Sequence, residues 1–392
     1  MKEVKQLVSG WTGSAWQRES TLHQLAPYIG KTKSSMAAAL VEEYSTKASV
    51  VYDPFSGCGT FALEAWRAGR AVIANDVSPY ARLLTRSKLF PYPSLEAALA
   101  DFANMAAKVN RRRRMTDLRS VPKWVREFFH PETLREALLW TAVLKAERRW
   151  FLLACLMGIL HHQRPGFLSF PSSHTVPYLR IKKFPRSRYP KLYAYRPVAN
   201  RLEAKVRRAF RRMPKLDFTL SRRCLGTRAE LQRLTAPVQS ILTSPPYMRQ
   251  LDYGRDNRLR LWFLGCDDWK TLDGIVSPRE KEFLALMRRC LRRWRRILAI
   301  NGYCVLIIGD TCSRENRKNL PDQVAEVAKK AGYVLASQHA DAIPNERRVR
   351  RGITGSSSET ILVLRNSALR RVSPTPGGLK PSARRSFSPP AA

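Results

Sequence analysis

The sequence predicts an α/β fold, with a mostly parallel, twisted sheet covered by helices on both faces. Two observations predict the sheet: short apolar, β-rich runs alternate with helical stretches before residue 91, and they do so again after residue 215. A third observation predicts a basic insertion of mainly helical and irregular structure, because the alternation stops over residues 91–215. We therefore expect one sheet assembled from two separated parts of the chain.

The first part of the chain has the pattern of a strand–loop–helix–strand unit. Residues 34–44 have the spacing of an amphipathic helix, and residues 49–52 are a short apolar strand. A glycine-rich loop at 53–60 leads into a helix that closes near Gly69, and residues 71–77 form a second buried strand that ends in an acid. This order is typical of the first half of a Rossmann-like sheet.

The insertion and the second part of the sheet follow in order. Helices are expected at 94–109 and 132–160, whereas residues 161–198 are rich in His, Pro, Tyr and basic side chains without clear periodicity. Beyond the insertion, the patterns predict strands at 216–221, 238–243, 302–309, 332–338 and 359–365, and helices at 280–299 and 321–331. The tail from Asn366 has no acid and many Pro and Ser, and is expected to be disordered.

The helix at 280–299 separates apolar from basic side chains. Its apolar positions fall on one face, and three arginine pairs lie mostly opposite, which is typical of a helix that covers a sheet and exposes its arginines to solvent. The predicted organisation is thus a first half of the sheet domain (1–90), a basic insertion (91–215), a second half of the sheet domain (216–365) and a basic tail (366–392).

Composition excludes several classes of protein. The 392 residues are 44% hydrophobic, which suffices for a sizeable core and excludes wholesale disorder. There is no apolar run of about 18 residues, so we expect no membrane span, and the amino terminus lacks the apolar region of a secretory signal. The seven cysteines are scattered singly without a CxxC pair, so we expect neither a metal site nor a disulfide framework, and a cytoplasmic location.

Charge points to a polyanionic partner. The chain has 70 basic and 31 acidic side chains, which gives a net charge of +39. The net charge is +4 over 1–90, +19 over 91–215, +8 over 216–300 and +8 over 301–392. A uniform arginine bias would spread the charge evenly, so this distribution favours a local element in the insertion that binds nucleic acid.

The glycine-rich loop DPFSGCGT lies between a strand and a helix. Gly57 and Gly59 allow a tight turn and a close approach of the backbone to a ligand, and the following helix directs N–H groups at that place. Asp76 ends the next strand 23 residues after Asp53, where an acid can accept hydrogen bonds from two ribose hydroxyls. Neither GxGxxG nor the P-loop pattern is met, so a nucleotide-type ligand and a purely structural turn both stay open.

A second loop, TSPPY, directly follows the apolar strand at 238–243. Its two prolines fix the backbone and remove two N–H donors, which leaves the Ser244 hydroxyl and nearby carbonyls as acceptors beside the Tyr247 ring. Such a site suits a planar group that carries an exocyclic amine; a rigid turn that packs a buried tyrosine is the alternative. Asp252 and Tyr253, shortly after the loop, are candidates for shaping a target pocket.

The combination of DPFSGCGT and TSPPY resembles the amino-group DNA methyltransferases, which use S-adenosyl-L-methionine. Residues 23–45 are similar to the helix that precedes the glycine loop in that family, and ANDVSPYA at 74–81 resembles its acidic second motif. The resemblance covers roughly 21–90 and 216–310. It implies a Rossmann-like class I methyltransferase fold, S-adenosyl-L-methionine as cofactor, and double-stranded DNA as partner.

The resemblance also implies roles for single residues. Ser244 and the Pro245 carbonyl would accept the protons of the target amine, and Tyr247 would stack on the flipped base. The catalytic loop would be Ser244, Pro245, Pro246 and Tyr247, and the cofactor residues Tyr28, Lys31, Asp53, Phe55, Gly57, Gly59, Thr60 and Asp76.

The target is expected to be the N4 amine of cytosine in DNA. Serine at the head of this loop is more frequent in the N4-cytosine members, and N6-adenine is the alternative. Methylation of a ring carbon would need a cysteine after a proline, and none of the cysteines has that context. An RNA base methyltransferase and a non-catalytic DNA-binding relative are further alternatives, the last disfavoured by the intact loops. The enzyme would either serve a restriction–modification system with a cognate restriction endonuclease or act alone.

Overall fold

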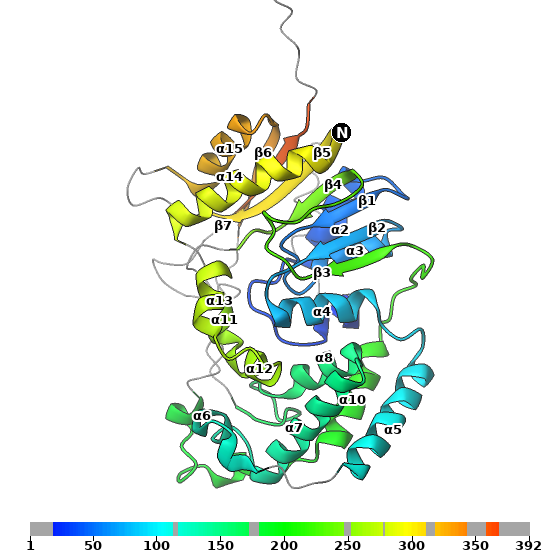
Figure 1. Ribbon diagram of the computed structural model, residues 1–392, viewed down its shortest axis with the longest axis vertical. Helices are drawn as coiled ribbons and strands as arrows, with labels where there is room; N and C mark the ends of the chain where they lie inside the picture. The colour runs from blue at the N-terminus through cyan, green and yellow to red at the C-terminus, as the bar shows by residue number, and fades with distance from the viewer. Residues whose placement is uncertain are drawn as a thin grey trace, which may run out of the picture.

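The computed structural model describes residues 19–112, 117–171, 180–246, 252–276, 279–310, 318–342 and 358–367, with the backbone alone described at 180 and 181. A sheet with its covering helices occupies one end of the molecule, and the helices of the insertion occupy the other (Figure 1). In the described part of the chain, no helix is long and apolar enough to cross a membrane.

The sheet has seven strands in the order β3-β2-β1-β4-β5-β7-β6. The strands are β1 (Val50–Asp53), β2 (Ala71–Asn75), β3 (Arg222–Leu225), β4 (Val238–Thr243), β5 (Leu298–Gly309), β6 (Val334–Ala342) and β7 (Ser358–Arg365). The neighbours from β3 to β5 are parallel, and β7 is antiparallel to both β5 and β6. The carboxyl ends of β1, β2 and β4 therefore meet at one edge of the sheet.

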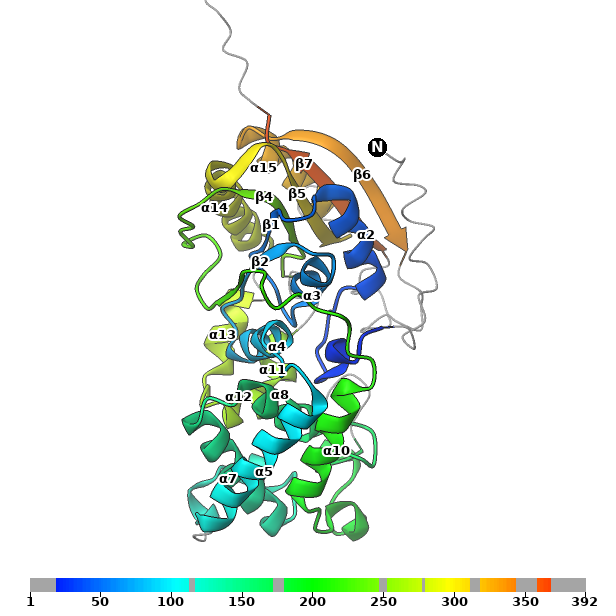
Figure 2. The same ribbon diagram turned by 90° about the vertical axis from the view of Figure 1, so that its right-hand side faces the viewer.

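Helices cover both faces of the sheet (Figure 2). One face carries α2 (Ser34–Tyr44), α3 (Thr60–Arg67) and α4 (Pro79–Leu89), and the other carries α14 (Glu280–Ile297) and α15 (Leu320–Lys330). Side chains alternate along a strand, so Val51 belongs to the apolar core on the first face and its neighbour Tyr52 to the core on the second.

The insertion is mainly helical. Its elements are α5 (Leu95–Arg111), η3 (Leu118–Ser120), α6 (Lys123–Arg126), α7 (Pro131–Ala146), α8 (Trp150–Ile159), α9 (Arg180–Lys183), η5 (Pro190–Tyr193) and α10 (Val198–Phe210). Elsewhere in the described part of the chain lie four short helices: η2 (Thr21–Gln24), α11 (Tyr253–Asp256), α12 (Arg258–Phe263) and α13 (Trp269–Val276).

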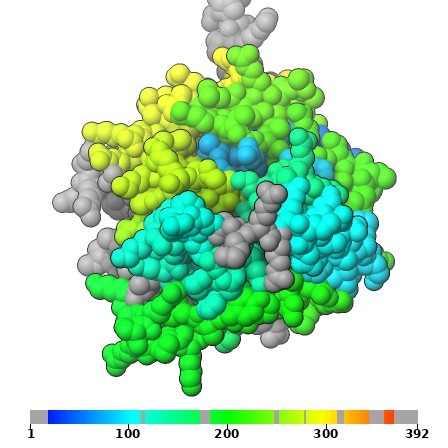
Figure 3. Space-filling model, turned by 60° about the horizontal axis from the view of Figure 1, so that its bottom comes forward, coloured from blue at the N-terminus to red at the C-terminus, as the bar shows by residue number. Residues whose placement is uncertain are grey.

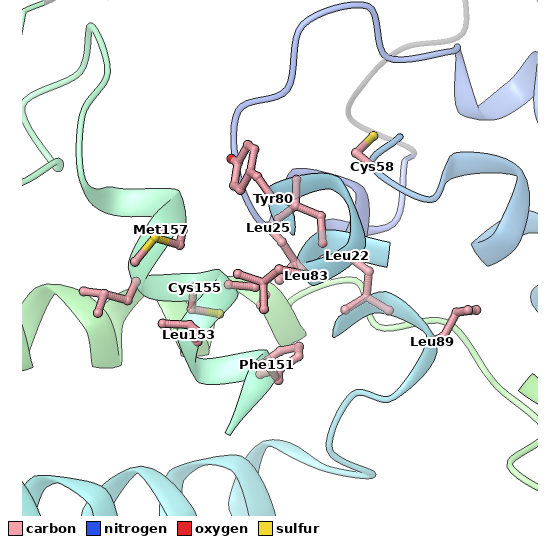
Figure 4. Close-up of a cluster of buried hydrophobic side chains, with 14 of the residues drawn as sticks. Leu22, Leu25, Cys58, Tyr80, Leu83, Leu89, Phe151, Leu153, Cys155 and Met157 are labelled. Carbon is pink, nitrogen blue, oxygen red and sulfur yellow. The ribbon is translucent and has the colours of Figure 1, made fainter. Parts of the chain in front are cut away.

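Helix α8 joins the insertion to the sheet domain. Every residue from Phe151 to Ile159 is buried, so this helix is apolar all round, as a helix at the centre of a core must be. Figure 4 shows Phe151, Leu153, Cys155 and Met157 of α8 beside the side chains of α4 and of the segment around η2. These side chains belong to one continuous core, so the insertion is packed into the first face rather than tethered to it.

The α/β prediction is confirmed, and the strand order agrees with the class I methyltransferase fold that the resemblance implied. The strand expected at 216–221 is wrong: β3 starts at Arg222, because the Asp217 side chain accepts the N–H of Thr219 and forms a turn there. The helix expected at 132–160 is two helices, since the chain breaks at Arg148, whose φ is 55°. Residues 368–392, most of the expected tail, lie outside the described residues.

Candidate active site

A cavity of about 370 Å³ lies where β1, β2 and β4 end. This is the edge at which open parallel sheets bind ligands. In Figure 3 it corresponds to a hollow in which blue atoms from the early part of the chain lie behind green and yellow-green segments. The cavity walls include predicted residues from both loops and from the segment before them: Tyr28, Lys31, Asp53, Phe55, Gly57, Thr60, Asp76, Ser244 and Pro246.

The two glycines of the loop have different tasks. Both have positive φ, 51° at Gly57 and 77° at Gly59, a conformation that side chains disfavour. Gly57 lines the cavity, and a Cβ there would lie 3.4 Å from the Tyr28 ring. Gly59 is not among the lining residues; a Cβ there would lie 2.8 Å from the Thr85 hydroxyl and 3.0 Å from its Cα. Gly59 thus lets helix α3 start close against α4.

Asp76 fixes the glycine loop to the end of β2. Its Oδ2 accepts the N–H of Gly57 at 2.8 Å, and its Oδ1 accepts the N–H of Ser78 at 2.8 Å. Burial raises the pKa of Asp76 to about 6, against the lowering effect of these two hydrogen bonds. The carboxylate lines the cavity, where its remaining lone pairs can accept hydroxyl donors.

Asp53 connects the two predicted loops. The Thr243 hydroxyl donates to Asp53 Oδ1 at 2.7 Å and accepts the N–H of Phe55 at 3.1 Å, so the ends of β1 and β4 are held together. Burial raises the pKa of Asp53 to about 8, with a smaller contribution from the nearby Asp76 charge. Burial thus favours the protonated form of the side chain, and the shared hydrogen bonds set the spacing between the loops.

The second loop reaches the cavity through Ser244 and Pro246. The Ser244 hydroxyl contacts the Ile307 carbonyl at 3.3 Å, which places it against β5. Pro245 is not among the lining residues, and Tyr247, the predicted stacking residue, lies outside the described residues. Tyr253, a candidate for shaping a target pocket, does line the cavity.

Aromatic rings form one wall beside the glycine loop. Tyr28 lies between Tyr80 and Tyr253, with ring centroids 6.1 Å from each. Burial raises the pKa of Tyr28 well above its usual value, so its hydroxyl stays protonated. Lys31 forms an ion pair with Glu19 and donates to the His23 carbonyl at 3.2 Å, which fixes the start of this wall.

Several lining residues were not predicted from the sequence. Glu230 follows β3, its side chain is 5% exposed, and it pairs with Arg228 at 2.6 Å and with Arg289 at 3.7 Å. Arg289 belongs to α14, whose arginines were expected to face solvent. Ile275 of α13 adds an apolar side chain. An acid five residues beyond Leu225, the end of β3, was the available signal for Glu230, whereas nothing local indicates α13.

The histidines of the insertion have structural contacts. His161 is buried, its Nδ1 lies 3.0 Å from the Ser169 carbonyl, and its ring packs edge-on against Phe128. His174 lies outside the described residues. In the described part of the chain, no three His, Cys, Asp or Glu side chains are grouped as ligands of a metal ion would be.

Comparisons with known proteins found similarity in solved structures alone. No family model and no curated protein matches the chain. TrmN from Thermus thermophilus is 14% identical over 88% of this chain and 52% of its own, with a TM-score of 0.35. A candidate DNA modification methylase from the same organism, solved with S-adenosyl-L-methionine, is 20% identical over 36% and 49%, with a TM-score of 0.22. The rRNA methyltransferase AviRa from Streptomyces viridochromogenes is 14% identical over 89% and 92%, with a TM-score of 0.32. The chain spans about half the length of the first two.

Proposed function

We propose that this protein is a DNA methyltransferase that transfers the methyl group of S-adenosyl-L-methionine to the exocyclic N4 amine of a cytosine. One observation supports this most: a single cavity is bordered by the glycine loop, by the acid after β2 and by Ser244 of the proline loop. The proline-rich acceptor loop thus stands beside the place that suits a nucleoside cofactor, so both reactants would meet in one cavity.

The residues present fit the cofactor. Gly57 leaves open backbone beside the cavity, Asp76 offers carboxylate acceptors for ribose hydroxyls, and Phe55 adds an apolar surface. Tyr28 and Lys31, from the segment before α2, border the same space. When bound, S-adenosyl-L-methionine supplies an electrophilic methyl group, and the protein need not form a covalent bond with the base.

The proline loop supplies acceptors for the amine. An exocyclic amine is a weak nucleophile because its lone pair is conjugated with the ring. The Ser244 hydroxyl and the Pro245 carbonyl can accept its two protons, and Pro245 and Pro246 have no N–H to compete. Accepting both protons makes the nitrogen more tetrahedral and directs its lone pair, so positioning is the main catalytic contribution.

The base must leave the duplex to enter a cavity of this size. Tyr247 is proposed to stack on the flipped base, and Tyr253 lines the same cavity. The charge of the insertion would hold the phosphates of the duplex. N6-adenine is the alternative target, since it presents the same amine to the same acceptors, and an RNA base is the second alternative. We also propose a cytoplasmic location and, where the enzyme serves a restriction–modification system, a cognate restriction endonuclease as partner.

The test is a methyl-transfer assay with labelled S-adenosyl-L-methionine. The protein is incubated with duplex DNA or with total RNA, and the product is digested to nucleosides. N4-methylcytosine is the expected product. N6-methyladenine would move the assignment to the alternative base, and label in RNA alone, or no transfer by folded protein that binds the cofactor, would refute the DNA assignment.

A substitution tests the role of the proline loop. Tyr247→Ala should keep cofactor binding, measured by calorimetry, and lose methyl transfer. The control is Ile300→Ala, which removes an apolar side chain that is 69% exposed and does not line the cavity, and it should keep both. Turnover that survives in Tyr247→Ala would contradict the stacking role.

A further inference from the structure

A second cavity lies at the other end of helix α4. Its volume is about 350 Å³, and it shares no lining residue with the first cavity. It is formed by the end of α4, the following loop and the turn between α7 and α8. We call it the Arg148 pocket; it is lined by Arg86, Phe90, Pro91, Tyr92, Pro93, Arg148, Arg149, Trp150 and Phe151.

The pocket has an excess of positive charge that the protein does not neutralise. Arg149 pairs with Asp101 at 2.9 Å, and Tyr92 donates to the same carboxylate. Among the described residues, neither Arg86 nor Arg148 has a carboxylate partner; Arg86 instead lies over the Trp150 ring, 5.3 Å from its centroid. Two guanidinium groups are therefore available to an anion at one opening.

Arg148 lies in a turn whose backbone conformation is unfavourable for a residue with a side chain. Its φ is 55°, in the left-handed region, where a residue with a Cβ is disfavoured and glycine is not. The turn between α7 and α8 would form more easily with glycine or asparagine. The side chain is exposed at the mouth of the pocket, so its own packing does not explain an arginine here.

Aromatic rings accompany the arginines. Phe90 is 45% exposed, unusual for a large apolar side chain, and it lines the pocket. Next to it, the Arg222 guanidinium lies over the rings of Trp66, Phe90 and Phe218, with distances to the centroids of 4.2, 5.5 and 5.4 Å. An exposed ring beside unpaired guanidinium groups suits a nucleotide of a duplex, whose phosphate pairs with arginine and whose sugar packs on the ring while its base stays stacked.

We propose that the Arg148 pocket binds a nucleotide of the substrate DNA outside the reactive cavity. Ser78, just before α4, lines the first cavity, and Phe90, just after it, lines the second. The 11 residues of α4 span roughly 16 Å. At ~3.4 Å per nucleotide of one strand, the pocket receives a nucleotide about five steps from the target base. The identity of the nucleic acid as DNA rests on the proposed function, whereas the pocket is inferred from its own lining residues.

Arg148→Gly provides the test, because it removes the guanidinium and, at the same time, relieves the unfavourable positive φ, which glycine adopts freely. The binding of a fluorescent 30-base-pair duplex is titrated at several salt concentrations. We expect three- to tenfold weaker binding and a dependence of log K on log salt that is smaller by about one unit, as for one lost phosphate contact. Arg148→Lys should keep the salt dependence of binding. Phe90→Ala should weaken binding without changing the salt dependence. Thermal unfolding should show Arg148→Gly to be at least as stable as the wild type.

The matched control is Arg292→Ala, which removes an exposed arginine from α14 on the opposite face of the sheet. Equal losses in the two variants would show a general charge effect and overturn the pocket, as would unchanged binding in Arg148→Gly. A loss confined to RNA of the same length would overturn DNA as the occupant. Binding is measured without turnover, so protein that fails to methylate DNA but loses affinity in Arg148→Gly keeps the pocket and refutes the proposed function.

Discussion

The two faces of the sheet are covered by helices of opposite character. On one face, α14 buries an apolar stripe that includes Phe283, Met287 and Trp294, and several of its arginines point away from the sheet. On the other face, eight of the 11 residues of α4 are buried, among them the polar Thr85 and Ser87. Helix α14 is an outer layer, whereas α4 is a middle layer between the sheet and the insertion.

The difference shows how the insertion is connected to the cavity through α4. Polar groups of α4 bond in both directions: the Thr85 hydroxyl donates to the Gly57 carbonyl at 3.0 Å, and the Ser87 hydroxyl contacts the Trp150 carbonyl at 2.9 Å. The glycine loop and α8 are thus held by residues two positions apart in one turn of the same helix. A change in the insertion should affect the cavity, whereas a change on the outer side of α14 should not.

The largest effect is expected at Leu153, which is fully buried in α8. Leu153→Ala removes core volume and should lower the free energy of unfolding by about 3 kcal/mol. Because the core is shared, denaturant unfolding followed by circular dichroism should remain a single transition. Leu231→Ala, at a side chain that is 64% exposed, is the control and should change little. Two separate transitions would show that the insertion folds as an independent unit.

Gly59→Ala should come next. The new Cβ would be placed at a positive φ and within 3.0 Å of the Thr85 backbone, which should cost about 2 kcal/mol of stability. Affinity for the cofactor, measured by calorimetry, should fall as the loop moves away from α4. Gly69→Ala is the matched control, since Gly69 also has positive φ but a Cβ added there would meet nothing within 4 Å. Equal effects in both variants would exclude the contact with Thr85 as the cause.

Asp76 predicts a pH dependence of cofactor affinity. Its pKa in the folded protein is raised to about 6. A ribose hydroxyl can donate to the Asp76 carboxylate, but the protonated carboxyl group offers one acceptor fewer. Affinity should therefore be constant above pH 7 and weaken by up to about tenfold per pH unit below pH 6. Because an acid with a raised pKa binds its proton more tightly in the folded state, stability of the free protein should fall as pH rises from about 4 to about 6. Asp76→Asn should remove the pH dependence of affinity and reduce that of stability, to which the raised pKa of Asp53 also contributes; a flat affinity profile from pH 5 to 8 in the wild type would contradict the role.

Ser87→Ala tests the link between α4 and α8 with a smaller change. Its hydroxyl contacts the carbonyls of Leu83 at 2.8 Å and Trp150 at 2.9 Å. Losing the bond across the helices should cost about 1 kcal/mol. Chemical denaturation gives the value, and Ser45→Ala, whose hydroxyl bonds within and beside α2 on the same face, is the comparison. A cost in Ser87→Ala below that of Ser45→Ala would argue against a stabilising role for this contact.

The smallest effect is expected on the outer side of α14. Arg292→Ala removes an exposed side chain and should change stability by less than about 0.5 kcal/mol and leave cofactor affinity unchanged. Arg289→Ala is a sharper variant on the same helix, because its side chain lines the cavity and reaches Glu230. The same cofactor affinity in both variants would remove the distinction between the two sides of α14.

Local chemistry explains what the sequence predicted and what it did not. The glycine loop and the proline loop were found because each needs its residue types at adjacent positions, and most of the strands around them alternate with helices in a regular way. The start of β3 was missed because the Asp217 turn interrupts an otherwise β-rich run. Glu230, Ile275 and Arg289 were missed because they reach the cavity through the tertiary fold, from three elements without a shared motif.

The strand order has a consequence for synthesis of the chain on the ribosome. The central strand β1 pairs on one side with β2, which follows closely, but on the other side with β4, whose first residue is Val238. At roughly 5–20 residues per second, β1 waits about 10 to 40 s for that neighbour. The helices of the insertion are made during this interval and contact one another locally. Until β4 emerges, α2, α3 and α4 can cover one face of the first half of the sheet, and α8 can in turn cover α4.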